Sequence, residues 1–189
     1  GLDMSLPKLY VDSNGNTPDF PKPYRTMESK IKREQRKLSR KEKGSKNYEK
    51  QRIKLAKQHA KAKHLRNDVL HKLSCALTDR YDLIAIEDLD MSAIKRSLRF
   101  GKSASDNGWG MFTDMLSYKA KRKGKQLVKV DRWFPSSKTC SHCGHIHKEL
   151  RLSDRIYLCP KCGHTMDRDQ QAAQNIVKEA KRMLLNAAF

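Results

Sequence analysis

Apolar residues at the start of the chain alternate with polar or small residues, as in a strand with one buried face. Leu2, Met4 and Leu6 follow this spacing, and a second apolar stretch follows at residues 9–11. The pattern predicts two short strands joined by a turn, with Asp3 in the first. The first strand begins abruptly, so we expect the chain to be part of something longer.

A continuous apolar run at residues 83–86 is typical of a strand buried on both faces. Glu87 and Asp88 follow it directly, and Asp90 lies just beyond. A carboxylate at the end of a buried strand is costly unless it is paired or binds a metal. Solvation at the edge of the sheet is the alternative. Residues 127–130 predict a further strand.

Helical spacing of apolar residues marks the rest of the chain. Residues 25–80 predict a hairpin of two helices, in which Gly44 ends the first helix and Ser45 caps the second. Further helices are expected at 109–123 and at 170–185. Their apolar positions are Met27, Ile31 and Leu38; Leu55, Ala62, Leu65, Val69, Leu73 and Leu77; Met111, Phe112, Met115 and Tyr118; and Ala172, Ala173, Ile176, Ala180, Met183 and Leu184.

Residues 92–110 follow the buried strand and are rich in arginine, lysine, glycine and serine. Glycine and serine favour irregular backbone, so we expect a flexible basic loop here. Beside a functional site, such a loop can act as a lid or as a guide for a bound strand.

The chain contains a large excess of basic residues, which indicates the kind of partner it binds. The formal net charge is +20, from 41 lysines and arginines against 21 acidic residues, and residues 25–72 alone hold 18 basic and five acidic residues. This excess predicts a polyanionic partner, of which nucleic acid is the default. A solvated helical face is the simpler alternative. A membrane surface is disfavoured because the basic helices contain few bulky apolar anchors. We expect no membrane span and see no signal peptide.

Four of the five cysteines form two Cys-x-x-Cys-Gly pairs, Cys140/Cys143 and Cys159/Cys162. Each pair lets two thiolates converge beside a tight turn, and the spacing between the pairs is typical of a zinc site. Four thiolates complete the tetrahedral shell of Zn²⁺, so the site should be structural. The fifth cysteine, Cys75, lies in a helical pattern and is predicted to be a small core residue.

Other interpretations of the cysteines are weaker. A redox motif would need a surrounding βαβ pattern, and disulfides would suit a secreted chain, whereas this pattern suits a reducing compartment. Four nearby histidines could each replace a cysteine as a zinc ligand, but four cysteines already suffice. We interpret them as surface or phosphate-contacting groups: His142, His145, His147 and His164.

Three acidic residues stand at the ends of predicted elements. Asp3 lies in the first strand, Glu87 ends the buried strand, and Asp169 begins the last helix. This order of elements, with acids in these places, is that of an RNase H-like α/β sheet with a two-metal site. Two Mg²⁺ or Mn²⁺ ions in such a site activate a water and stabilise the leaving oxygen of a phosphodiester.

Three motifs carry a resemblance to a known family. Residues 1–6 (GLDMSL) resemble the first RuvC motif, residues 84–91 (IAIEDLDM) the second, and residues 167–176 (DRDQQAAQNI) the third. With the cysteine pairs between the last two, the chain resembles the C-terminal half of TnpB, a transposon-encoded RNA-guided DNA endonuclease related to type V CRISPR effectors. Ser5 and Gln171 depart from the usual glycine and asparagine, which puts contacts to the substrate strand near Gln171 in doubt.

The resemblance implies a RuvC-like fold, with a mixed sheet, flanking helices, a basic helical hairpin and an inserted Cys₄ zinc ribbon. Residues 1–135 would form the nuclease core, including the hairpin at 25–80 and completed by residues 165–189. Residues 136–164 would form the zinc ribbon. The family's N-terminal half, which grips the guide RNA and recognises the target-adjacent motif, is absent from this sequence.

The resemblance also implies that Asp3, Glu87 and Asp169 are the catalytic metal ligands, with Asp167 as the weaker candidate for the third acid. The expected cofactors are structural Zn²⁺ and catalytic Mg²⁺ or Mn²⁺. The expected partners are DNA, as a single or unwound strand whose bases stack on Trp109 or Trp133, and a guide RNA in the full-length protein. The expected location is the prokaryotic cytoplasm, at the nucleoid.

Two other functions compete with the nuclease. A non-catalytic regulator that binds guide RNA or DNA could keep the fold, but it would not need the three acids. A zinc-ribbon transcription factor would explain the cysteines and the charge, but not Asp3 and Glu87. Nothing in the sequence offers the tyrosine or histidine-pair chemistry of a single-strand transposase.

Overall fold

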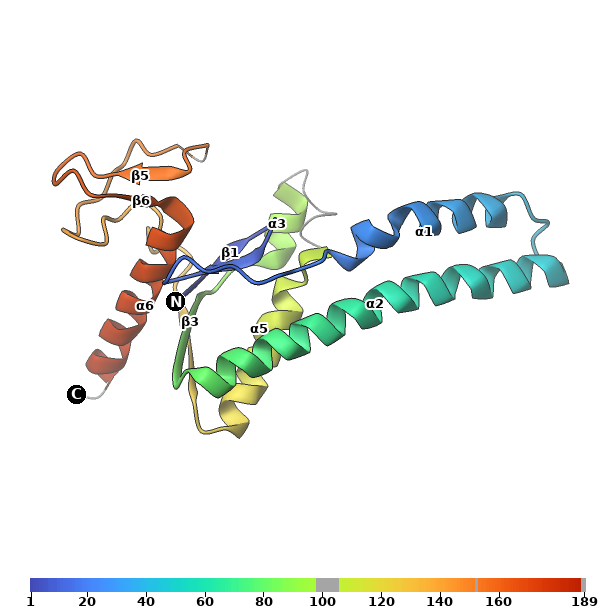
Figure 1. The fold of residues 1–189 in the computed structure, drawn as a ribbon, viewed down its shortest axis with the longest axis horizontal. Helices are drawn as coiled ribbons and strands as arrows, with labels where there is room; N and C mark the ends of the chain where they lie inside the picture. The colour runs from blue at the N-terminus through green and yellow to red at the C-terminus, as the bar shows by residue number, and fades with distance from the viewer. Residues whose placement is uncertain (98–105, 152, 188–189) are drawn as a thin grey trace.

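The computed structural model describes residues 1–97, 106–151 and 153–187, without the side chains of Lys95 and Ser97. It contains a mixed four-stranded sheet, helices on both faces of the sheet, a long helical hairpin and a small second sheet (Figure 1). In this part of the chain, no helix combines the length and the apolar character that a membrane crossing requires.

The main sheet has the strand order β2-β1-β3-β4. Its strands are β1 (Leu2–Ser5), β2 (Leu9–Asp12), β3 (Leu83–Glu87) and β4 (Gln126–Val130). β2 runs antiparallel to β1, whereas β1 and β4 both run parallel to β3. The two predicted N-terminal strands and the mixed α/β class are confirmed.

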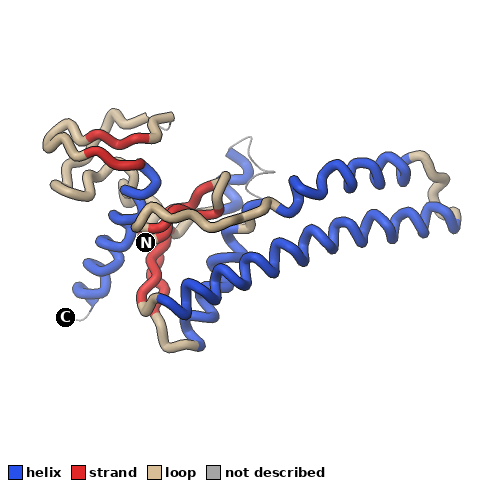
Figure 2. Tube along the Cα trace, in the orientation of Figure 1, coloured by secondary structure: helices blue, strands red, loops and turns tan. Residues whose placement is uncertain are grey.

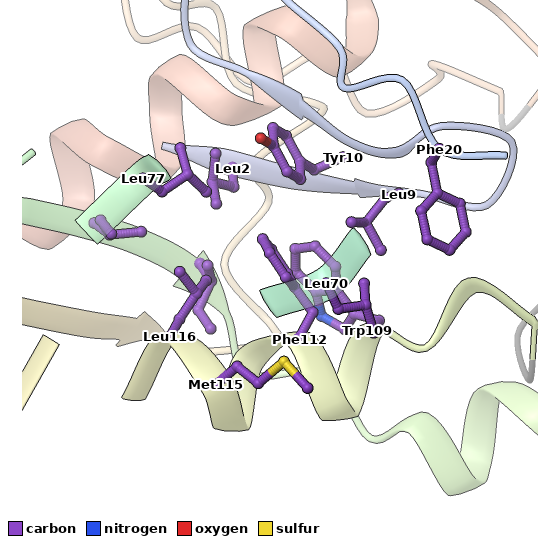
Figure 3. Packing of buried hydrophobic residues seen from close by; sticks show 12 residues of the cluster. Leu2, Leu9, Tyr10, Phe20, Leu70, Leu77, Trp109, Phe112, Met115 and Leu116 are labelled. Carbon is purple, nitrogen blue, oxygen red and sulfur yellow. The ribbon is translucent and has the colours of Figure 1, made fainter. Parts of the chain in front are cut away.

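Alternate residues of β3 enter two different cores, as expected for a strand buried on both faces. Ile84 and Ile86 pack in the core beneath α5 (Trp109–Arg122) and the second half of α2, whereas Ala85 packs with α6 (Arg168–Ala187). Figure 3 shows the larger core, which also contains Leu2, Leu9, Tyr10, Phe20, Leu70, Leu77, Trp109, Phe112, Met115 and Leu116.

The basic hairpin consists of α1 (Pro23–Ser39) and α2 (Lys46–Arg80), and it extends away from the sheet (Figure 2). The 35 residues of α2 span about 52 Å at about 1.5 Å per residue. The hydroxyl of Ser45 accepts a hydrogen bond from the Tyr48 N–H at 3.1 Å, so the predicted cap is confirmed. Gly44 lies in the connecting loop, after α1 has ended at Ser39.

The loop expected at residues 92–110 is wrong at both of its ends, where the chain is helical. A short helix, α3 (Met91–Ser97), occupies its start, because the carboxylate of Asp90 caps the Ser92 and Ala93 N–H groups. Residues 98–105 lie outside the described residues. Asp106 is buried, because its carboxylate accepts from backbone N–H groups at the start of α1.

Four residues predicted to be apolar contacts are exposed: Leu65, Cys75, Tyr118 and Met183. The interface between α2 and α5 uses polar residues instead. Lys119 of α5 is buried and donates hydrogen bonds of 2.7 Å to the Ser74 hydroxyl and to the His71 carbonyl oxygen. Ser74 therefore faces α5, and Cys75, one position farther round the helix, faces solvent.

A second, two-stranded sheet pairs β5 (Ile156–Leu158) with β6 (Thr165–Asp167). It lies beside the N-terminus of α6 in Figure 1. Its core contains Leu150 and Tyr157 together with Cys140 and Cys159. β6 leads directly into α6, so this small unit is joined without a linker to the helix that covers the main sheet.

Candidate active site

The register of the central strands places Asp3 beside Glu87. Leu2 of β1 pairs with Ile86 of β3, so the next residue of each strand occupies an adjacent position on strands about 4.8 Å apart. Leu2 and Ile86 both lie in the core on the α2 and α5 side. Because side chains alternate along a strand, Asp3 and Glu87 lie on the opposite face, which α6 covers.

Asp169 comes to this face from α6. It lies in the first turn of the helix, and Ala172, Ala173 and Ile176 follow it on the side buried against the sheet. Residues three, four and seven positions apart share one face of a helix. The packing of α6 on the sheet therefore brings Asp169 over the end of β1 and β3.

Asp3, Glu87 and Asp169 line one cleft of about 500 Å³. Carboxylates are the ligands that Mg²⁺ prefers, and three of them in one cleft suit a hydrated divalent cation. The same cleft is lined by cationic and aromatic side chains: Arg132, Trp133, Lys138, Arg155 and Arg168. A cleft with acids and cations together can hold a metal and a phosphate at the same time.

Burial and mutual repulsion disfavour the charged forms of the acids in the cleft. Burial raises the pKa of Asp3 well above its ordinary value, and the negative charges of Glu87 and Asp169 raise it further. Arg168 opposes this effect. Burial also raises the pKa of Glu87, against a hydrogen bond from the Ser136 hydroxyl that favours its charged form. Cations in the cleft would relieve the repulsion between these groups.

Asp167, the weaker candidate for the third acid, has another role in the structure. Its Oδ1 accepts hydrogen bonds of 3.0 Å from the N–H groups of Asp169 and Gln170, so it caps the N-terminus of α6. Asp167 is exposed, and it does not line the cleft. The geometry therefore favours Asp169 over Asp167 as the third acid.

The two tryptophans differ sharply in exposure. Trp109 is 2% exposed and packs against Phe112 with ring centroids 5.7 Å apart. The prediction that Trp109 stacks on bases is therefore wrong, because its position at the start of α5 faces the core. Trp133 is 85% exposed and lines the cleft, so it keeps the stacking role as a prediction.

Sequence reasoning missed a pair of residues that support the acids. Ser136 donates its hydroxyl hydrogen to Oε1 of Glu87. Asn175 of α6 donates from Nδ2 to the Ser136 carbonyl oxygen at 2.8 Å and to the Thr139 carbonyl oxygen at 2.6 Å. Both lie in segments already singled out, but only the folded chain shows that they meet.

The four cysteines of the two pairs form a compact cluster. Their sulfur atoms all lie within 4.8 Å of one another, with 3.7 Å between Cys140 and Cys162 and 3.6 Å between Cys143 and Cys159. A tetrahedral Zn²⁺ with bonds of about 2.3 Å requires sulfurs about 3.8 Å apart, whereas a disulfide requires about 2.05 Å. The donors thus fit a structural zinc ion. Among the described residues, this cluster includes none of the histidines.

The two pairs have nearly identical backbone geometry. The Cys140 N–H donates to the His145 carbonyl oxygen, and the Cys159 N–H donates to the His164 carbonyl oxygen, each at 2.8 Å. The glycine that follows each pair closes the turn with a φ of 72° or 71°, a conformation that favours glycine. Burial alone would raise the pKa of the Cys159 thiol, but backbone N–H groups and neighbouring thiols lower it.

The outer face of the helical hairpin is basic and open to solvent. Lys46, Lys50, Lys54 and Lys57 are exposed, and no ion pair of theirs is present among the described residues. Inside the hairpin, Met27 and Ile31 pack against Ala62, and Gln51 donates to the Glu34 carboxylate at 2.8 Å. The hairpin therefore needs none of these four lysines for its own packing, which leaves them available to phosphates.

Comparison with family models identifies two regions. Residues 1–98 match the family model described as "Probable transposase" (OrfB_IS605), and residues 109–176 match the model described as "Cas12f1-like, TNB domain". The second match spans α5, β4, the cysteine cluster and the first half of α6. Together the two models cover most of the elements that form the cleft.

Curated relatives agree with these models. A "Putative RNA-guided DNA endonuclease" of Streptomyces pristinaespiralis is 39% identical over 177 residues, which cover 94% of this chain and 44% of the relative. InsQ of Escherichia coli, with the same description, is 32% identical over 199 residues, which cover 97% of this chain and 49% of InsQ. The chain thus spans about half of the length of the curated relatives that it matches first.

Solved structures share the fold. A chain in the cryo-EM structure of the Cas12f1–sgRNA–target DNA complex matches with a TM-score of 0.64 and 19% identity, over 93% of this chain and 48% of that one. A second chain, from a CRISPR–Cas12f ternary complex, matches with a TM-score of 0.56 and 21% identity, over 80% and 32%. At these identities the likeness concerns the fold alone. The "Probable transposase" model matches residues 1–98, which are more than half of this chain. The chain therefore belongs to the TnpB family, as its motifs predicted.

Proposed function

We propose that this chain is the nuclease part of an RNA-guided DNA endonuclease, with a RuvC-like fold and a two-metal site that hydrolyses DNA phosphodiester bonds. One observation carries the proposal: Asp3, Glu87 and Asp169 come from three separate elements and line one cleft that cations also line. A protein that only bound nucleic acid would have no use for three mutually repelling carboxylates.

The three carboxylates would hold Mg²⁺ or Mn²⁺. When bound, the two ions supply an activated water and neutralise the charge that develops on the departing 3′ oxygen. Arg132, Lys138 and Arg155 line the same cleft and would bind the phosphates on either side of the scissile bond. The products should carry 5′-phosphates, and no covalent intermediate with the protein should form.

The partners follow from charge and shape. The substrate should be single-stranded or unwound DNA, because an extended strand can present one phosphate to the cleft while a base stacks on the exposed Trp133. The basic hairpin would bind further phosphates of DNA or of a guide RNA. The names of the relatives, and the sgRNA and target DNA bound in the Cas12f1 structure, support these two partners.

Cleavage of single-stranded DNA tests the proposal. Purified protein should cut in Mg²⁺ or Mn²⁺ and should not cut in EDTA. Asp169→Ala should lower the cleavage rate at least about a hundredfold, because it removes a ligand from the metal ions that would stabilise the transition state. DNA affinity should stay nearly unchanged, because the arginine and lysine side chains that bind phosphates remain.

Asp114→Ala is the matched control, because Asp114 is an exposed acid on α5, away from the cleft. This variant should cut like the wild type. If Asp169→Ala still cuts, the assignment moves to Asp167 or fails. A wild-type protein that binds DNA but never cuts it, with or without guide RNA, would instead indicate a non-catalytic regulator.

A further inference from the structure

We propose that Ser136 is a positioning residue for the Glu87 carboxylate, and that Asn175 of α6 holds Ser136 in place. This inference rests on the proposed function, in which Glu87 binds a divalent cation. It extends the site to the turn at residues 135–139, which joins the cleft to the cysteine cluster.

The first contact fixes one oxygen of Glu87. The Ser136 hydroxyl donates to Oε1, and Ser136 itself is only 6% exposed. Among the described residues, Oε2 accepts no hydrogen bond, so it is the oxygen left for a cation. A carboxylate held at one oxygen loses rotational freedom but keeps its other oxygen available. Partners of this kind orient metal ligands and are worth about 10–100-fold in metal affinity.

The second contact fixes the position of Ser136. Asn175 is 3% exposed, and its Nδ2 donates to the carbonyl oxygens of Ser136 and Thr139. Both partners are acceptors, so the amide nitrogen, and not Oδ1, must face them. One side chain thus holds the turn at two points three residues apart. The backbone of the turn cannot carry Ser136 away from Glu87 without breaking at least one of these bonds.

This arrangement couples three parts of the molecule. Asn175 lies six residues after Asp169 on the same helix, so α6 both presents one acid and steadies another. Cys140, the first cysteine of the cluster, directly follows Thr139. The cysteine cluster, α6 and Glu87 therefore meet at this single turn.

The test measures cation binding without DNA and without cleavage. Mn²⁺ is titrated into zinc-loaded protein, and the free Mn²⁺ is followed by electron paramagnetic resonance. Ser136→Ala should bind Mn²⁺ about tenfold more weakly than the wild type. Ser137→Ala is the matched control, because Ser137 also lines the cleft but makes no hydrogen bond among the described residues, so its affinity should stay unchanged. Ser136→Thr, which keeps the hydroxyl, should restore most of the affinity.

The role of Asn175 is tested by a double-mutant cycle. Asn175→Ala should weaken Mn²⁺ binding in the wild type but should have little further effect in the Ser136→Ala background. Zinc content and circular dichroism of each variant report whether the fold is intact. Additive effects of the two substitutions on Mn²⁺ affinity would overturn the role of Asn175. If Asn175→Ala fails to fold, the comparison of Ser136→Ala with the wild type still tests the role of Ser136.

Failure of this inference differs from failure of the proposed function. If the wild type binds no Mn²⁺ that Asp169→Ala removes, the proposed metal site itself is wrong. If the wild type binds Mn²⁺ and Ser136→Ala binds it equally well, the metal site stands and the positioning role of Ser136 is overturned.

Discussion

At the residue scale, the pKa of Asp3 is raised well above its ordinary value. Asp3 lies in the short strand β1, beside Glu87 and beneath Asp169, and its pKa is raised by burial and by these two negative charges. A group whose pKa is higher in the folded than in the unfolded protein stabilises the fold fully below its unfolded pKa. That stability is lost as the pH rises through the folded pKa.

Asp3→Asn should therefore stabilise the protein at neutral and higher pH in the absence of added divalent cations. Each unit of raised pKa corresponds to about 1.4 kcal/mol, and a gain of about 1 kcal/mol would raise Tm by roughly 2–4 °C. Calorimetry at pH 4 and at pH 8 measures the effect. The difference from the wild type should grow with pH, whereas Asp114→Asn should show no such trend. If the difference in Tm stays constant between the two pH values, the neighbouring carboxylates do not repel the charged form of Asp3.

At the element scale, α6 connects the cysteine cluster to the cleft. The Asp167 cap and the two hydrogen bonds of Asn175 tie the helix to the segments on either side of the cluster. Lys178 adds a hydrogen bond to the Ser141 carbonyl oxygen, one residue past Cys140. Removal of a metal bound by the four cysteines should thus loosen the N-terminal half of this helix first.

Cys159→Ser should abolish zinc binding and loosen the start of α6, because metal binding and local folding are coupled. Hydrogen exchange of amides should become faster around residues 169–176, while β3 and β4 stay protected. Cys75→Ser is the control, because Cys75 is exposed on α2 and far from the cluster in sequence. Elemental analysis that finds no zinc in native, unchelated wild-type protein would contradict the assignment of the metal.

The elements themselves were largely predictable from the sequence, because apolar runs and periodicity depend on burial. The apolar run at residues 83–86 predicts β3, and the spacing of the cysteines predicts that they cluster. Two of the errors share one physical origin: polar side chains that satisfy their hydrogen bonds can be buried. Ser74 and Lys119 bond to each other inside the α2–α5 interface, which leaves Cys75 outside. Asn175 and Ser136, 39 residues apart, meet only when α6 packs on the sheet, and no local pattern records this.

At the scale of the whole molecule, two surfaces of different character are separated. The sheet and α6 form one end, and the basic hairpin extends from them for most of the length of α2 (Figure 1). Asp3, Glu87 and Asp169 all lie at the first end. Charge on the hairpin can thus determine how tightly a polyanion binds without determining whether it is cut.

Substitution of Lys50, Lys54 and Lys57 with glutamine should weaken binding to single-stranded DNA most at low salt. Each lost phosphate contact lowers the slope of log K against log salt concentration by about 0.7, so the slope should fall by up to about 2. Fluorescence anisotropy over a range of salt concentrations measures it. Glutamine at Lys121, Arg122 and Lys181, three exposed cations elsewhere, should leave the slope nearly unchanged. Equal slopes in all three proteins would place the binding surface away from the hairpin.

The cleft draws Asp3 from the first strand and Asp169 from the last helix, so its acids are separated by nearly the whole sequence. A ribosome makes the chain in order, at about 5–20 residues per second, and releases the N-terminal part first. The nascent protein therefore exposes its basic hairpin to nucleic acid well before α6 emerges to deliver the third carboxylate. A polypeptide still being translated would attract a polyanion but would lack the third carboxylate, so the proposed cutting activity could not appear before α6 has packed on the sheet.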